Sequence, residues 1–231
     1  MNDHDIRITR RSSLAAFGGF LGTVLGVGAW KADASEGAGP AGVASGAVTC
    51  VLAPEQTQGP YYLPGAKTRR NITEGRPGTP LTLRATVVDA STCKPIKGAS
   101  VDVWHADASG TYSGVQQTVG QTFMRGIQKT AANGLALFKT VYPGWYPGRT
   151  VHIHVIVHVG GNVVHTGQLY FSDKVTDAAF KKAPYSSRGA RDTRNANDSV
   201  YRNGGSKSLV TIHGDGAGGY VASIVMGIHR S

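Results

Sequence analysis

The sequence predicts an all-β fold, an antiparallel β-sandwich with long irregular loops and little helix. Short runs rich in β-branched and aromatic residues follow one another along the chain, and glycine and proline fall between them. Glycine accounts for 32 of the 231 residues, about twice the usual frequency of ~7%. Because no long run repeats apolar residues with the period of a helix, short strands joined by turns are the simplest architecture.

The first 34 residues are typical of an export signal. Arg10 and Arg11 form a twin-arginine pattern ahead of an apolar, glycine-rich stretch, and the small residues up to Ala34 fit a cleavage site. The apolar stretch is short, so no stable membrane span is expected in the mature chain. We therefore expect export by the twin-arginine route, to the periplasm or outside the cell. The alternative is a disordered basic tail or a short anchor.

The β-sandwich domain is expected to span residues 49–231, after a flexible linker at 35–48 that is rich in Gly, Ala and Ser. A polar, irregular segment is expected at 173–206, with one or two helical turns at 176–182. The strands, in chain order, are expected at 81–89, 99–104, 135–141, 151–159, 163–171, 209–212 and 220–228.

The two cysteines favour a disulfide, because an isolated pair in an exported protein is usually bridged. A bond between Cys50 and Cys93 would close a loop worth ~4 kcal/mol in the chain-entropy model. The competing interpretation is two buried free thiols.

The net charge of +10 favours solubility or attraction to anionic polymers and substrates. The sequence contains no nucleic-acid-binding motif, so no nucleic-acid partner is expected.

Two histidines form the strongest candidate for a metal site. His152 and His154 are two residues apart in a β-rich run, so in a strand both would point to one face, roughly 7 Å apart at the backbone. Tyr146 lies just upstream in a turn made by proline and glycine, and Arg149 lies between. Tyr112 follows another strand and a glycine-containing loop. Each tyrosine taken alone is more often a packing residue.

Five segments together are similar to the intradiol ring-cleavage dioxygenases, which include catechol, hydroxyquinol and protocatechuate dioxygenases. The likeness is closest to the short, exported branch of that family. The matching segments are Gly59-Pro60-Tyr61-Tyr62, Gly110-Thr111-Tyr112, Tyr142-Pro143-Gly144-Trp145-Tyr146-Pro147, Arg149-Thr150-Val151-His152-Ile153-His154 and Gly167-Gln168-Leu169-Tyr170-Phe171.

The resemblance implies a non-haem Fe(III) as cofactor and a small aromatic diol with O2 as substrates. The ring would be cleaved between its two hydroxylated carbons, to a product of the cis,cis-muconate type. Phenolate is a hard anionic donor that favours Fe(III), and imidazole also suits iron. The metal ligands implied by the resemblance are Tyr112, Tyr146, His152 and His154.

The resemblance also implies roles for neighbouring residues. Tyr146 would leave the metal and take up a substrate proton, and Arg149 would stabilise negative charge on the ring. Gln168 would donate a hydrogen bond near the O2 or substrate site. The substrate pocket would be lined by Pro60, Tyr61, Trp145 and Arg149. His105, His158 and His165 are not expected to be ligands.

Two departures from the family limit what the resemblance implies. The spacing from Tyr146 to His152 is short, which leaves substrate size open. The helical N-terminal region that makes dimers in cytoplasmic catechol dioxygenases is not found, so that dimer is not expected, while another homo-oligomer stays open. The alternative functions are an exported β-sandwich binding module with a structural or non-iron metal site, and an inactive relative that keeps the fold.

Overall fold

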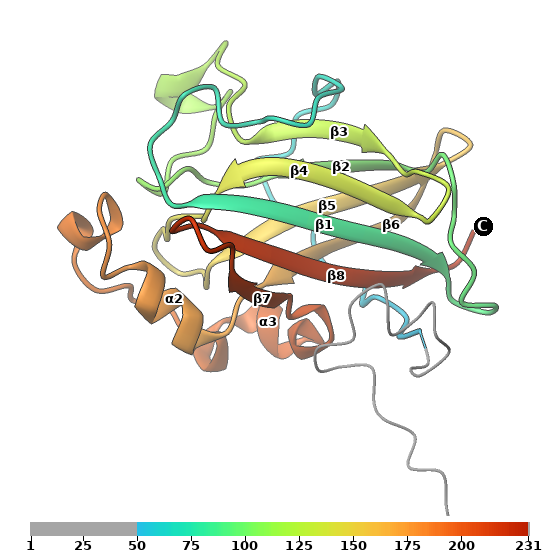
Figure 1. The fold of residues 1–231 in the computed structure, drawn as a ribbon. Helices are drawn as coiled ribbons and strands as arrows, with labels where there is room; N and C mark the ends of the chain where they lie inside the picture. The colour runs from blue at the N-terminus through green and yellow to red at the C-terminus, as the bar shows by residue number, and fades with distance from the viewer. Residues whose placement is uncertain (1–49, 231) are drawn as a thin grey trace, which may run out of the picture. The chain divides into compact units, whose positions relative to one another are not determined.

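The computed structural model describes residues 50–230, which form two four-stranded β-sheets packed face to face (Figure 1). One sheet has the strand order β4-β1-β8-β7 and the other has the order β3-β2-β5-β6. The prediction of an all-β sandwich is confirmed. The expected export signal at 1–34, its cleavage after Ala34 and the linker at 35–48 lie outside the described residues. The strands are β1 (Pro80–Asp89), β2 (Ser100–Trp104), β3 (Arg125–Lys129), β4 (Leu135–Val141), β5 (His152–Val159), β6 (Asn162–Tyr170), β7 (Thr211–Gly214) and β8 (Tyr220–Ile228).

Strand β1 lies between β4 and β8, and its two edges pair in different directions. It runs antiparallel to β4 and parallel to β8, with Leu81 opposite Tyr220. The other named strand pairs in the described part of the chain are antiparallel. A parallel pair needs a crossover connection, and here the chain builds the whole second sheet between β1 and β8.

The core between the sheets is built from alternate residues of the facing strands. In β5, Ile153, Val155 and Val157 point into this core together with Leu83 of β1 and Ile224 of β8. The opposite face of β5 is buried as well, because loops cover the outside of its sheet. Residues on that outer face are therefore shielded from water although they lie outside the main core.

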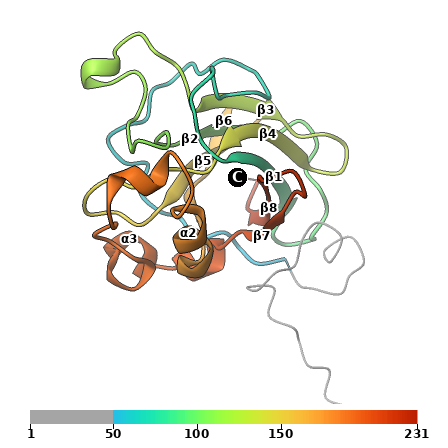
Figure 2. The same ribbon diagram turned by 60° about the vertical axis from the view of Figure 1, so that its left-hand side comes forward.

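The segment at 173–206 contains more helix than the sequence predicted. Helix α2 spans Asp173–Ala179 and helix α3 spans Ser199–Arg202, with short 3₁₀ turns between them. Figures 1 and 2 show this segment along one side of the sandwich, next to β6 and β7. Asp198 is the N-cap of α3. Within residues 50–230, no helix is long and apolar enough to cross a membrane.

A disulfide joins Cys50 to Cys93, with 5.5 Å between their Cα atoms. It links the segment that precedes β1 to the turn that follows β1. The same segment pairs with β8, because the Ala53 amide donates a 2.8 Å hydrogen bond to the Gly227 carbonyl. The start of the described chain is thereby fixed against the sheet that contains β1 and β8.

Candidate metal and substrate site

Strand β5 supplies two histidines to the outer face of its sheet. His152 and His154 alternate with the core residues of the strand, and they are only 3% and 1% exposed. His154 lies opposite Trp104 of β2 and opposite Gln168 of β6 in the sheet register. Its ring stacks on the Trp104 indole, with 4.8 Å between ring centroids and 5° between planes. The neighbouring strands therefore fix the orientation of this imidazole.

The two imidazoles converge through their Nε2 atoms, which are 3.0 Å apart. The Nδ1 atom of His152 lies 2.6 Å from the Thr150 carbonyl oxygen. Since a carbonyl only accepts, this contact assigns the proton of a neutral His152 ring to Nδ1 and leaves a lone pair on Nε2. Burial, aided by the charge of Arg149, lowers the pKa of His152 to about 3. His152 is therefore a neutral ring whose Nε2 lone pair faces His154 Nε2.

Two tyrosines complete the cluster from two loops. The Tyr146 hydroxyl lies 3.2 Å from His152 Nε2. The ring of Tyr112 lies 5.5 Å from that of Tyr146 and 6.1 Å from that of His154, measured between centroids. The structure thus brings all four predicted metal ligands around one point.

Glycines allow the two tyrosine-bearing loops to meet backbone to backbone. The loop after β2 carries Tyr112, and the loop before β5 carries Tyr146. Gly110 has a φ of +81°, and a Cβ there would collide with the Trp145 carbonyl oxygen. Gly144 donates a 3.0 Å hydrogen bond to the Asp107 carbonyl, which joins the loops directly. A side chain at either glycine would separate Tyr112 from Tyr146.

The donor set fits a highly charged metal ion. The Tyr112 hydroxyl is buried and has no well-formed hydrogen bond to the described residues. Burial and the neighbouring phenol of Tyr146 raise the pKa of Tyr112 well above its ordinary value, and burial also raises the pKa of Tyr146. Both phenols therefore stay protonated unless a strong Lewis acid binds them. Residues 50–230 contain no group of three or more His, Cys, Asp or Glu side chains that could hold a metal, so a metal at this point would need the phenols.

Arg149 and Gln168 lie together beside the cluster. The Arg149 guanidinium donates to Gln168 Oε1 at 2.5 Å, and Gln168 Nε2 donates to the Thr57 carbonyl at 2.9 Å. Gln168 is 1% exposed. These contacts hold the segment around Thr57 over β5 and β6.

Asp198 is a residue of this site that the sequence analysis missed. Its carboxylate is fully buried and accepts from Arg149 Nε at 2.9 Å and from the Thr150 amide at 2.7 Å. The same carboxylate accepts from the amides of Val200 and Tyr201, each at 2.8 Å. Thr150 is also the residue whose carbonyl fixes the His152 ring, so Asp198 anchors both Arg149 and the start of β5.

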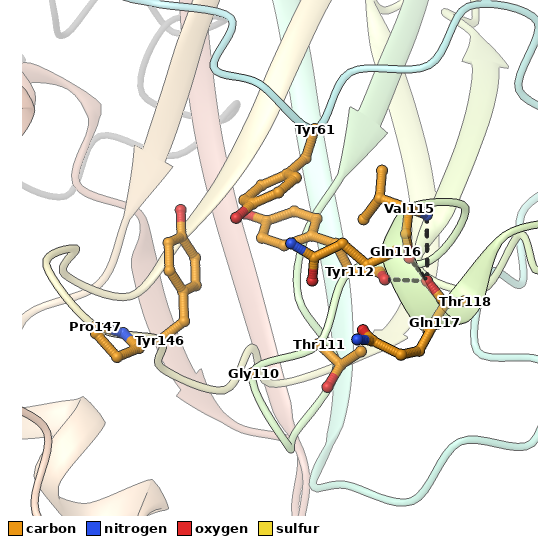
Figure 3. Close-up of a pocket in the computed structure, with 10 residues that line it drawn as sticks. All are labelled: Tyr61, Gly110, Thr111, Tyr112, Val115, Gln116, Gln117, Thr118, Tyr146 and Pro147. Carbon is orange, nitrogen blue, oxygen red and sulfur yellow. Dashed lines mark hydrogen bonds between the residues drawn. The ribbon is translucent and has the colours of Figure 1, made fainter.

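A cavity of about 450 Å³ opens onto the two phenols (Figure 3). Tyr61 lines it and stacks on Tyr112, with 4.5 Å between centroids. Pro60, Trp145 and Arg149, which were also predicted to line the substrate pocket, are not among the residues around this cavity. The Trp145 ring instead packs under the Arg188 guanidinium. The cavity is lined by Tyr61, Gly110, Thr111, Tyr112, Val115, Gln116, Gln117, Thr118, Tyr146 and Pro147.

The other histidines considered in the sequence lie in other settings. His105 is buried, and its Nε2 lies 2.7 Å from the Thr140 hydroxyl. His165 pairs with Glu55 at 2.6 Å. His158 is half-buried near the far end of β5. They make contacts outside the cluster of two phenols and two imidazoles.

Comparison with known proteins finds relatives of this chain. A family model described as dioxygenase matches residues 57–198, which include all four candidate ligands. Chlorocatechol 1,2-dioxygenase of Pseudomonas putida is 30% identical over 139 residues, which make up 49% of this chain and 52% of that protein. Catechol 1,2-dioxygenase 1 of Acinetobacter lwoffii is 34% identical over 100 residues, 40% of this chain and 32% of that protein. The chain thus spans about half the length, or less, of these curated relatives.

The match to a solved structure covers a larger share of this chain than the matches to these curated relatives. The intradiol ring-cleavage dioxygenase from Tetranychus urticae is 36% identical, with a TM-score of 0.75. The match covers 78% of this chain and 96% of that one.

Proposed function

The chain belongs to the intradiol dioxygenase family, and on this premise we propose that it cleaves the aromatic ring of a catechol-type diol with O2. The proposed product is a dicarboxylic acid of the cis,cis-muconate type. The observation that carries the proposal is the convergence of two imidazoles with two phenols that line a cavity.

We propose that Tyr112, Tyr146, His152 and His154 hold a non-haem Fe(III). Phenolate oxygen and imidazole nitrogen together suit ferric iron, and the two phenolates would offset two of its positive charges. The metal, when bound, would supply the Lewis acid that activates the diol and couples it to O2. Two features of this chain support the assignment: the Tyr112 hydroxyl has no hydrogen-bond partner among the described residues, and His152 Nε2 is the unprotonated ring nitrogen.

Tyr146 and residues around the four candidate ligands would supply proton uptake and charge stabilisation. Tyr146 lines the cavity and is the more accessible phenol, so its Oη is the group placed to take up a proton from a substrate hydroxyl. Arg149 places a fixed positive charge beside Tyr146, and Asp198 and Gln168 hold it there. Negative charge that develops on the bound ring would be stabilised by that guanidinium. His154 stacks on Trp104, and both side chains are buried from water.

The test measures iron content, visible absorption and O2 uptake with catechol. Two tyrosinates on Fe(III) should give a visible charge-transfer band that shifts when a catechol binds. We expect Tyr146→Phe to keep the fold and lose most turnover, and the His152→Ala, His154→Ala double variant to lose iron. The matched control is His158→Ala on the same strand, which should retain iron. Wild-type iron content in the double variant would refute the proposed site.

We also propose that the protein is exported and acts without nucleic acid or a stable membrane span. The twin-arginine pattern at Arg10 and Arg11 supports this, and so does the disulfide between Cys50 and Cys93, because such bonds persist in oxidising compartments. Fractionation of cells that express the full chain tests the proposal. Recovery of all the protein in the cytoplasm, uncleaved, would contradict it.

A further inference from the structure

Part of the cavity is lined by polar side chains that have no role in the proposed ring cleavage. Four residues, Val115–Thr118, form the wall opposite Tyr146 and Pro147; we call them the carboxamide loop, after Gln116 and Gln117. Figure 3 shows the Gln116 carboxamide directed across the cavity toward Tyr146, and the Gln117 carboxamide beside Thr111. Gln116 and Gln117 are both exposed, and neither carboxamide has a hydrogen-bond partner among the residues that the structure describes. Their donors and acceptors face solvent and are available to a ligand in the cavity.

The backbone of Gln116 is strained. Its φ of +50° lies in the left-handed region, which residues other than glycine, asparagine and aspartate rarely adopt. Strain of this kind persists only where the surrounding structure enforces it, and it is concentrated at ligand-binding sites. Gln116, although exposed, lines the cavity in this conformation.

The carboxamide loop is fixed to the tyrosine that carries the candidate metal site. The Thr118 hydroxyl lies 2.6 Å from the carbonyl oxygens of Tyr112 and Val115 and accepts from the Val115 amide at 3.2 Å. The amide of Gly114 donates to the Thr118 carbonyl at 2.9 Å. A substituent that binds Gln116 therefore lies at a defined distance from Tyr112. Recognition of a substituent at one position of a bound ring requires such a fixed distance.

The residues around the cavity carry no formal charge: phenols line its inner end, carboxamides and a threonine hydroxyl line its outer end, and Val115 and Pro147 are apolar. A volume of about 450 Å³ lies within the ~300–1,000 Å³ of pockets that enclose drug-sized ligands, so it has room for more than one bare ring. A carboxamide both donates and accepts, and so pairs with a neutral polar group. A carboxylate placed at the carboxamide loop would find no cationic side chain among the residues that line the cavity.

We propose that Gln116 recognises an uncharged hydrogen-bonding substituent, such as an amide or a hydroxyl, on the ring of the diol. This rests on the proposed function of the site. It makes the substrate a catechol with a neutral polar side chain, in preference to bare, alkyl or carboxylated catechols. Gln116 determines specificity in this account and takes no part in ring cleavage.

The experiment compares catechols substituted at ring position 4 with a carboxamide, a methyl group or a carboxylate. The ratio of kcat/KM for the carboxamide to that for the methyl compound is compared between variants, because the electronic effect of each substituent then cancels. We expect this ratio to fall about fivefold in Gln116→Met, the change that one neutral hydrogen bond makes. Gln116→Lys should instead raise the carboxylate-to-methyl ratio at least about fivefold, since its charge would pair with the carboxylate.

The matched control is Gln121→Met, the same replacement at an exposed residue just after the carboxamide loop that does not line this cavity. It should keep both ratios of the wild type. An unchanged carboxamide-to-methyl ratio in Gln116→Met, an equal fall in Gln121→Met, or no carboxylate gain in Gln116→Lys would each overturn the inference.

Dissociation constants measured without O2 separate this inference from the proposed function. If the iron-loaded wild type cleaves none of the diols, the proposed function fails. The ratio of dissociation constants, carboxamide to methyl, then decides the role of Gln116 by the same fivefold criterion. Melting curves of each variant establish that the fold is kept.

Discussion

Replacing Asp198 by asparagine should destabilise the whole protein and loosen the site at once. The carboxylate accepts at both oxygens: one faces Arg149 and the Thr150 amide, and the other faces the amides of Val200 and Tyr201. An asparagine in either orientation turns its NH2 toward two of these N–H donors. Two hydrogen bonds are then lost whichever way the side chain lies.

The magnitude follows from the burial of Asp198, which is fully buried, and from the charge of its partner. Each buried donor left unsatisfied costs ~1–3 kcal/mol, and breaking a buried ion pair from one side costs ~3–5 kcal/mol. Because Arg149 is 18% exposed and still donates to Gln168, we expect a loss of about 3 kcal/mol in the free energy of unfolding. Typical domains have only ~5–15 kcal/mol in total.

The pH dependence gives a second signature. Burial opposes ionisation of Asp198, but hydrogen bonds from the Tyr201 and Thr150 amides and the charge of Arg149 outweigh it, so the pKa lies below its ordinary value. A depressed pKa contributes stability that is present above the unfolded-state pKa of ~4 and is lost as the pH falls through the folded-state value. The difference between wild type and Asp198→Asn should therefore be full at neutral pH and shrink in acid.

The assay is urea unfolding followed by circular dichroism, with iron content measured on the same samples. We expect the iron content of Asp198→Asn to fall, because Thr150 also positions the His152 ring. Asp192→Asn is the control, since Asp192 is exposed and accepts from the Gly148 amide at 3.2 Å and from the Thr193 hydroxyl at 2.9 Å; its effect should stay within ~0.5 kcal/mol. A loss below about 1 kcal/mol in Asp198→Asn, or no difference between the two variants, would refute the reasoning.

Two further changes test the packing around the site. Asp102 is 2% exposed, and burial raises its pKa to about 7 despite Tyr62 and Arg125; the raised value means that the wild type loses stability as the pH rises from ~4 to 7. Asp102→Asn should therefore stabilise the protein more at pH 8 than at pH 5. The gain in the free energy of unfolding should be up to ~3 kcal/mol larger at pH 8, and an equal gain at both pH values would contradict this. Gly110→Ala should cost roughly 2 kcal/mol or more and reduce iron content, because its Cβ would meet the Trp145 carbonyl. Gly148→Ala, which has the same sign of φ but open space around its Cβ, should cost less in urea unfolding and keep its iron.

The fold and the centre of the site were predictable because both depend on local pattern. Alternation in β5 places His152 and His154 on one face whatever the rest of the chain does, and the strands expected from β-branched runs lie within a few residues of those observed. The strand β3 was not predicted, because its residues include Gly126 and two charged side chains. Its Arg125 is nonetheless buried, since the Ser113 carbonyl and hydroxyl accept from its guanidinium.

Features that depend on distant parts of the chain were not predictable. Asp198 lies in a polar stretch that resembles a loop, and nothing local to it indicates that its carboxylate meets Arg149. The sequence offers one local indication of the structural role of Asp198. Aspartate is a favoured N-cap residue, whose side chain accepts hydrogen bonds from amides two and three residues later at the start of a helix. The wall made by Val115–Thr118 was missed for a similar reason, because its place beside Tyr146 depends on how two separate loops meet.

The parallel pairing of β1 with β8 has a consequence for how the protein folds. The edge of β1 that pairs with β8 lacks its partner until the last strand of the chain is made, after every strand of the second sheet. Pairing of such distant segments is slow, and an open strand edge beside an apolar face readily captures another chain. A chain in which β8 has not yet paired with β1 would therefore be prone to aggregation, and we expect chaperones or low concentration to raise the refolding yield.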